Sequence, residues 1–132
     1  MAAMTKEEFV QHVKSDTLPM YRLAYSILQN SADAEDAVSE AIVHAYEKLD
    51  TLKKADSFRN WILQIAANEA KKIYRQNKRT SPVEWEENLS PEFYDEHHEL
   101  WDAVMQLDGG YRDVIVLFYY ERCTIPEISR IL

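Results

Sequence analysis

Apolar residues recur every three or four positions over most of the chain, which is the spacing of amphipathic α-helices. Thr5 and Glu8 form a capping-box pattern that predicts a short first helix. A second helix, with a proline at its start, is predicted over residues 19–30. The spacing predicts two longer helices over residues 33–49 and 57–79. Only two glycines and four prolines occur in 132 residues, so few turns are available and we expect an all-α fold.

The predicted helix over residues 33–49 has two distinct faces, and Ser31 and Asp33 are both possible N-caps for it. Its apolar face consists of Ala34, Val38, Ala41, Ile42, Ala45 and Leu49. A different face, within roughly 80° of arc, carries Asp33, Asp36, Glu40, His44 and Glu47. Stacked carboxylates repel one another, so we expect a cationic partner outside the chain. The helix dipole is an alternative explanation for Asp33, Glu35 and Asp36, but it does not extend to Glu40 and Glu47.

The helix over residues 57–79 is also two-faced. Its predicted core face consists of Phe58, Ile62, Ile65, Ala66 and Ile73, with Leu63, Ala70 and Tyr74 at the edge. The remaining arc carries Asn60, Trp61, Gln64, Asn68, Lys71, Lys72, Arg75, Lys78 and Arg79. That arc therefore combines cations with amide side chains and an indole.

Charge is strongly segregated along the sequence. Residues 53–79 contain eight lysines and arginines against Asp56 and Glu69, a net charge of +6 within a chain of net charge −8. Cations interleaved with planar side chains suit a nucleic-acid backbone with bases within reach. A solvated helix face is the alternative, because basic residues are common late in helices. With acidic segments on both sides, we expect the free protein to bind duplex DNA poorly.

The C-terminal part of the chain begins after residues 80–98, which have two prolines, many acids and no sustained period, and which we interpret as a linker. Core spacing returns at Leu100, Trp101, Val104 and Leu107, and Gly109-Gly110 is predicted to end that helix. Residues 111–121 are nearly all apolar and are predicted to form a buried helix. Residues 124–127, T-I-P-E, form a capping box with proline in the first turn. A helix, a brief turn and a capped helix are how a helix-turn-helix begins, and its recognition helix would follow Leu132.

Several kinds of chemistry find no support in the sequence. Cys123 is the single cysteine, which excludes an internal disulfide and indicates a reducing, cytoplasmic setting. It precedes a helix cap without a positioned base, so a structural thiol is favoured over a nucleophile. His97 and His98 are adjacent in the linker and more typical of a solvated pair than of a metal site. No apolar run approaches the length of a membrane span, and we predict no catalytic residue, cofactor or metal.

Three segments together resemble the extracytoplasmic-function (ECF) group of bacterial RNA polymerase sigma factors. The first, YRLAYSILQNSADAEDAVSEAIVHAYEKL, resembles the polymerase-binding region with its D-A-E-D hallmark. The second, SFRNWILQIAANEAKKIYRQNKR, is similar to the family's pattern of Trp-Leu, an Ile-Ala pair, Asn and a basic tail. The third, LWDAVMQLDGGYRDVIVLFYYERCTIPEISRIL, is similar to the start of the promoter-binding C-terminal domain. Departures from the family pattern are Ser39, Ala67, Lys72 and Asp108.

The resemblance implies a sigma region 2 bundle over residues 1–79, a flexible linker over 80–98, and the start of region 4 over 99–132, without its recognition helix. It implies docking on the clamp helices of the largest subunit of core RNA polymerase through Asp33, Glu35, Asp36, Glu40 and Glu47. It implies contacts to promoter DNA, mainly the minus-ten element, through Lys53, Lys54, Arg59, Trp61, Asn68, Lys71, Lys72, Arg75, Lys78 and Arg79. For Trp61, core packing is the alternative to base contact.

The expected function is therefore promoter recognition, promoter melting and transcription initiation, in the cytoplasm, without enzymatic activity or membrane insertion. The resemblance also implies control by an anti-sigma factor, whose site we expect on apolar surfaces around the linker and the C-terminal helices. The alternative function is a helical regulator or adaptor that binds a protein through its acidic helix and does not contact DNA.

Overall fold

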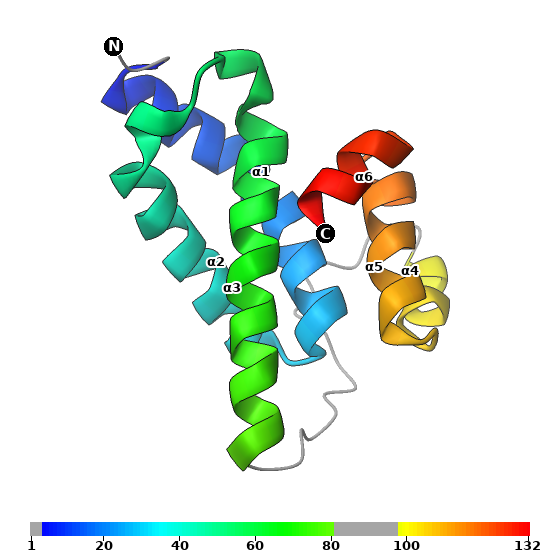
Figure 1. Cartoon of the computed structure of the whole chain (residues 1–132). Coiled ribbons are helices and arrows are strands. Elements are labelled where there is room, and N and C mark those ends of the chain that lie inside the picture. Colours follow the sequence, from blue (N-terminus) through cyan, green and yellow to red (C-terminus); the bar gives the residue numbers. More distant parts are fainter. Residues whose placement is uncertain (1–3, 81–97) are drawn as a thin grey trace.

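The computed structural model describes residues 4–80 and 98–132, and every regular element in these two ranges is helical, which confirms the all-α class (Figure 1). Three long helices come first: α1 (Lys6–Leu28), α2 (Ser31–Glu47) and α3 (Phe58–Thr80), with short 3₁₀ turns η1 (Leu49–Thr51) and η2 (Ala55–Ser57) between the last two. Four shorter elements follow: α4 (His98–Met105), α5 (Gly109–Ile115), the π-helical turn η4 (Val116–Tyr120) and α6 (Ile125–Ile131). We call residues 98–132 the C-terminal segment.

Helix α1 corrects the prediction of two separate N-terminal helices. It starts at the predicted capping box of Thr5 and Glu8, but it continues without a break through Pro19. A proline inside a helix removes one backbone hydrogen bond and costs about 3 kcal/mol. Phe9 before it and Met20 after it are both buried in the same core, and this packing offsets the cost. The helix ends where Gln29 adopts a left-handed conformation, with φ 56°.

Helix α2 has the predicted apolar face but a different cap. Asn30, rather than Ser31 or Asp33, is the N-cap, and its side-chain oxygen accepts a hydrogen bond from the backbone amide of Asp33 at 2.9 Å. The predicted apolar residues are buried, except that Ile42 is half-buried, and Ala37 is buried beside them. The small alanines on this face let α2 approach its neighbours closely.

Helix α3 is buried over a wider arc than its amphipathic pattern predicted. Leu63 and Ala70, expected at the edge, are fully buried, as is Ala67, whereas Ile65 and Ile73 are only half-buried. The reason is that α3 packs against α1, α2 and also α6. A helical-wheel analysis that assumes one core face does not predict contacts with α6, because α6 lies far from α3 in the sequence.

The C-terminal segment corrects several boundaries. Gly109 and Gly110 form the first turn of α5, with Asp108 at the N-cap position, instead of ending α4. Leu100 and Leu107, predicted as core, are both 39% exposed, while Trp101 and Val104 are buried as expected. The capping box of Thr124 and Glu127 at the start of α6 is confirmed. The predicted linker falls almost wholly on residues 81–97, which lie outside the described residues.

The apolar stretch over residues 111–121 is helical, as predicted, but it is not a buried helix. Val116 and Leu117 are fully buried. The opposite side is exposed and consists of Tyr111, Val114, Ile115, Phe118 and Tyr119. The stretch packs with one side against α1, so its other side remains an apolar surface.

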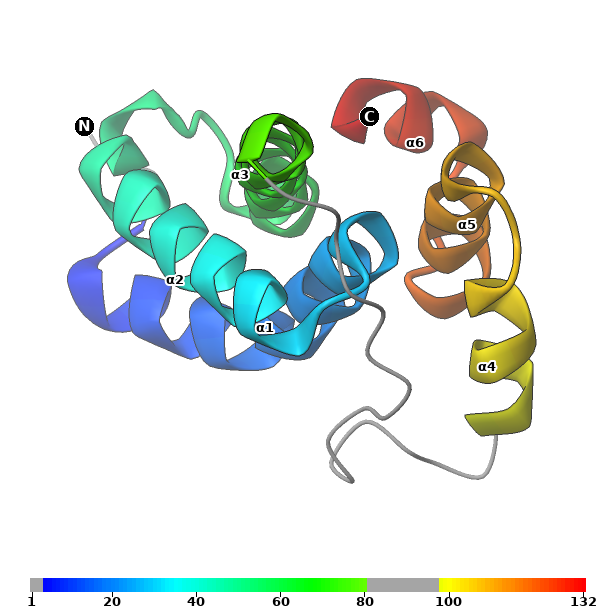
Figure 2. The ribbon, with the colours of Figure 1, turned by 90° about the horizontal axis from the view of Figure 1, so that it is seen from below.

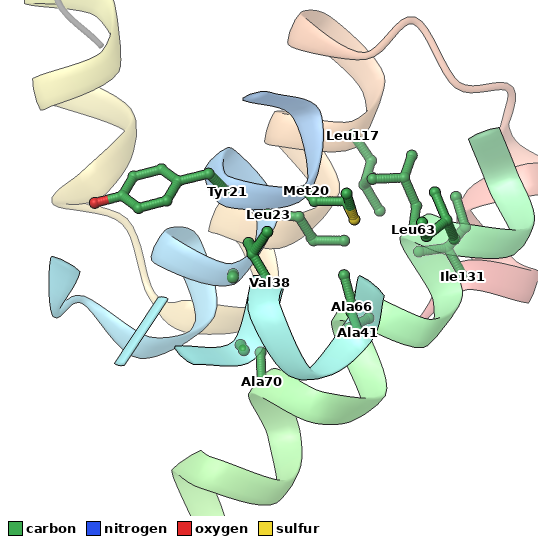
Figure 3. Packing of buried hydrophobic residues seen from close by; sticks show 14 of the residues in the cluster. Met20, Tyr21, Leu23, Val38, Ala41, Leu63, Ala66, Ala70, Leu117 and Ile131 are labelled. Carbon is green, nitrogen blue, oxygen red and sulfur yellow. The ribbon is translucent and has the colours of Figure 1, made fainter. Parts of the chain in front are cut away.

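A single cluster of buried apolar residues joins the C-terminal segment to the long helices. Figure 2 shows α4, α5 and α6 on the side of α1 and α3 that faces away from α2. In the close view, Leu117 and Ile131 reach toward Leu63 on α3 and Met20 on α1 (Figure 3). The position of the C-terminal segment is therefore fixed by core packing as well as by polar contacts.

Candidate nucleic-acid interface

The outer side of α3 presents one part of the predicted cationic surface to solvent. Asn68, Lys72, Arg75 and Lys78 are all exposed and lie three or four residues apart on this helix. The ammonium group of Lys78 lies 5.0 Å from the ring centroid of Tyr74, which leaves the lysine at the surface. We call these four residues the open cationic face. Among the described residues, no acidic side chain forms a salt bridge with Lys72, Arg75 or Lys78.

Trp61 lies at the border between this face and the core. Its side chain is half-buried, packs against the apolar cluster, and has its ring centroid 5.8 Å from that of Phe58, with the rings tilted by 54°. Core packing, one of the two alternatives raised for this residue, is therefore observed, and base contact stays a prediction. One part of the indole packs on the core and the other part remains exposed.

The other predicted DNA-binding residues lie elsewhere. Lys53 and Lys54 are exposed in the connection between η1 and η2, ahead of α3. For Arg79 only the backbone, in the last turn of α3, is described. Arg59 and Lys71 are half-buried and bonded to the C-terminal segment, so they do not belong to the open cationic face.

The predicted polymerase-binding acids on α2 divide in a similar way. Asp36, Glu40 and Glu47 are exposed on the side of α2 opposite its buried alanines. Val43, 51% exposed, lies among them along the helix. His44 is half-buried beside these acids, and its Nδ1 lies 2.6 Å from Oε1 of Glu69 on α3. We call Asp36, Glu40 and Glu47 the acidic face.

Asp33 and Glu35 are placed differently from the acidic face. The carboxylate of Asp33 accepts a hydrogen bond from the Asn77 side-chain amide of α3 at 2.9 Å, so it has a partner within the chain. Glu35 is exposed, but two residues along a helix turn the side chain through about 200°, away from Asp33. Helical spacing grouped Asp33 with the other acids, whereas Glu35 was included only through the family resemblance.

Comparisons with known proteins identify the family to which the chain belongs. Residues 14–80 match the family model described as Sigma-70 region 2. The chain is 28% identical over 131 residues to RNA polymerase sigma factor SigV of Bacillus subtilis, covering 96% of this chain and 79% of that protein. It is 29% identical over 132 residues to the ECF RNA polymerase sigma factor SigW of the same organism, covering 86% and 71%. The chain belongs to the sigma-70 family, in its ECF group.

A shorter match points the same way. A probable RNA polymerase sigma factor of Haemophilus influenzae is 38% identical over 79 residues, which is 56% of this chain and 40% of that protein. Both faces of this ECF sigma factor lie on α2 and α3, within the matched residues 14–80.

A buried polar network between α1 and the C-terminal segment of the sigma factor was not predicted. Arg22 on α1 binds Glu121, whose side chain is fully buried, through Nε to Oε1 at 3.1 Å and through Nη2 to Oε2 at 3.2 Å. Ser26 donates its hydroxyl to Asp113 at 2.8 Å, and Arg112 Nε donates to the Ser26 carbonyl at 2.6 Å. The sequence signal for this network is limited to charged residues inside apolar stretches: Arg22 within residues 18–28, and Arg112, Asp113 and Glu121 within residues 111–121.

Burial raises the pKa of Asp113 to about 6, against the opposing effects of the Ser26 hydroxyl and the positive charges of Arg112 and Lys71. Burial likewise raises the pKa of the Cys123 thiol, which disfavours the reactive thiolate. Within residues 4–80 and 98–132, no three His, Cys, Asp or Glu side chains gather as a metal site would require. No helix in these ranges has the length and apolar character of a membrane span.

Proposed function

We propose that this ECF sigma factor, which serves promoter recognition and transcription initiation, divides its two tasks between neighbouring helices. The acidic face of α2 docks on core RNA polymerase, and the open cationic face of α3 holds the separated strand of the minus-ten element. The observation that carries this proposal is the exposure of both sets of charges on adjacent packed helices, with α2 and α3 in direct contact.

The open cationic face suits a single strand better than a duplex. Lys72, Arg75 and Lys78 can neutralise successive phosphates, while the exposed amide of Asn68 offers hydrogen bonds to base edges. The exposed part of Trp61 adds a stacking surface, worth about 1–3 kcal/mol for each stacked base. By capturing unstacked bases, these residues contribute to promoter melting without chemistry on the DNA.

The acidic face offers a different kind of surface. Three carboxylates at helical spacing complement a cationic ridge, and Val43 among them can enter an apolar depression once water is removed. We place the clamp helices of the largest polymerase subunit on this face. Asp33 contributes less in this proposal, because its carboxylate already accepts a bond from Asn77.

We propose that the protein works in the cytoplasm. We also propose that an anti-sigma factor covers the exposed apolar side of α5 and η4. The support is chemical: Tyr111 is 70% exposed, Phe118 59% and Tyr119 53%, and contiguous apolar surface of this kind is typical of protein–protein interfaces.

The DNA assignment can be tested with the full chain bound to core RNA polymerase and a library of bubble templates whose non-template strand is randomised. We expect wild-type complexes to enrich particular bubble sequences. The double variant Lys72→Glu with Arg75→Glu should retain these bubble sequences much more weakly. The slope of log K for DNA binding against the logarithm of the salt concentration should become shallower by about 1.4, which is about 0.7 for each of two lost phosphate contacts on a single strand. Lys6→Glu with Lys14→Glu makes the same charge change at exposed positions of α1 and is the matched control.

The same experiment separates the sigma factor from an adaptor that never contacts DNA. An adaptor would show no sequence enrichment in the library and would be indifferent to the substitutions at Lys72 and Arg75. Equal retention of the wild type and that double variant would therefore contradict the proposed DNA face.

A further inference from the structure

Three polar residues of α3 are bonded to the C-terminal segment. Arg59 donates to the backbone carbonyl of Glu121, and the side-chain amide of Asn60 donates to the carboxylate of Glu127. One turn beyond Ala67, the Lys71 ammonium donates to the carbonyl of Leu132 at 3.1 Å. These contacts follow one side of α3 from its first turn to its middle, where α6 lies against it (Figure 2).

The contacts on α3 are reinforced by the buried network on α1. The Glu121 side chain is fully buried and is bound by Arg22, whose own side chain is 22% exposed. Asp113 and Arg112 bond to Ser26 on the next turn of α1. Buried apolar side chains, Leu117 and Ile131 among them, fill the space between these polar groups (Figure 3). Such an interface is a specific docked state rather than a loose encounter, since its charges are paired and its core is closed.

We propose that the C-terminal segment is a built-in latch: docked on α1 and α3, it occupies Arg59, Asn60 and Lys71 and must move away before that side of α3 can bind nucleic acid. This inference rests on the proposed DNA-binding role of α3. The N–H groups that bond the C-terminal segment are not available to a nucleic acid, and α6, packed against this side of α3, occupies space that a strand bound there would need. The open cationic face stays available in the docked state, so DNA can make a first contact there and then compete with the latch.

The charge pair between Arg22 and Glu121 makes the latch testable without altering α3. Arg22→Glu places two carboxylates together at a buried position and should release the C-terminal segment. Lys14→Glu is the matched control, because Lys14 is exposed on the same helix and the change in net charge is identical. Glu121→Arg is a second releasing variant from the other side of the interface, and the double reversal restores opposite charges.

The first readout is the radius of gyration of the full chain by small-angle X-ray scattering, with circular dichroism to confirm that the helices remain. A compact chain of this length has a radius of gyration of about 14 Å. We expect wild type and Lys14→Glu near this value, both single reversals to be larger, and the double reversal to return toward it. Single reversals that keep their helices and stay as compact as the wild type would overturn the latch.

The second readout is fluorescence-anisotropy binding of a short single-stranded oligonucleotide of A and T. If nine-tenths of the molecules are docked, and the docked form binds only weakly through the open cationic face, release should tighten binding by up to about tenfold in Arg22→Glu and not in Lys14→Glu. Expansion with unchanged affinity, in a protein whose binding still depends on Lys72 and Arg75, would overturn the competition while leaving the proposed function intact. Expansion without binding by any variant would support a releasable interface and contradict the proposed DNA-binding role of α3.

Discussion

The guanidinium of Arg22 on α1 donates hydrogen bonds to both carboxylate oxygens of Glu121, 99 residues further along the chain. This pair lies where the C-terminal segment packs against α1, beside the helix α3 that carries the open cationic face. Because Glu121 has no exposed side-chain surface, its charge is compatible with the fold only while Arg22 remains in place.

The energetic consequence of this pair can be measured directly. Arg22→Met leaves a buried, unpaired carboxylate, and we expect it to lower the free energy of unfolding by about 3–5 kcal/mol in a urea titration. Arg22→Met combined with Glu121→Met replaces both charges by apolar groups and should recover most of that loss. A single variant as stable as the wild type would show that the pair contributes nothing.

Asp113 gives the fold a specific pH dependence. Its pKa is raised from 3.8 to about 6 by burial, although the Ser26 hydroxyl and the charges of Arg112 and Lys71 oppose this. A raised pKa means that the stabilising contribution of the protonated carboxyl is complete below pH 3.8 and is lost as the pH rises through about 6. Asp113→Asn should remove this component, so its stability relative to wild type should increase by roughly 2–3 kcal/mol between pH 4 and pH 7. Parallel pH profiles of unfolding for the two proteins would contradict the assignment.

Leu63 tests the wider burial of α3. It is fully buried, in a cluster that also contains Ile131 of α6. Leu63→Ala should destabilise the protein by about 2–5 kcal/mol, from lost apolar contacts and the remaining cavity. Leu100→Ala is the matched control, since Leu100 is 39% exposed and its truncation should cost less than about 0.5 kcal/mol. Equal effects of the two truncations in thermal unfolding would argue against the observed packing of α3.

The long helices and their apolar faces were predictable because their signals are local. The alanine-rich face of α2 and the capping boxes at Thr5 and Thr124 each depend on residues within a few positions. Such short-range patterns are set by helical geometry, so they survive whatever tertiary contacts form. The prediction of a helix start at Pro19 was wrong because it used a local rule alone. Buried residues before and after Pro19 pack into the same core, and this packing keeps α1 continuous.

What could not be predicted depends on contacts between distant parts of the chain. The burial of Ala67 and the engagement of Arg59 and Lys71 follow from the position of the C-terminal segment. A helical wheel treats all outward-facing cations alike, because it contains no information on contacts with residues about sixty positions further along the chain. The predicted site residues therefore divide into an open set and a bonded set that the sequence did not distinguish.

The central claim is that two adjacent helices carry separate tasks, and the affinity of the full chain for core RNA polymerase tests it most directly. We predict that Asp36→Arg with Glu40→Arg weakens this binding by at least about a hundredfold, whereas Lys72→Glu with Arg75→Glu leaves it unchanged. Wild-type affinity in the first double variant, or an equal loss in both, would contradict the division of roles between α2 and α3.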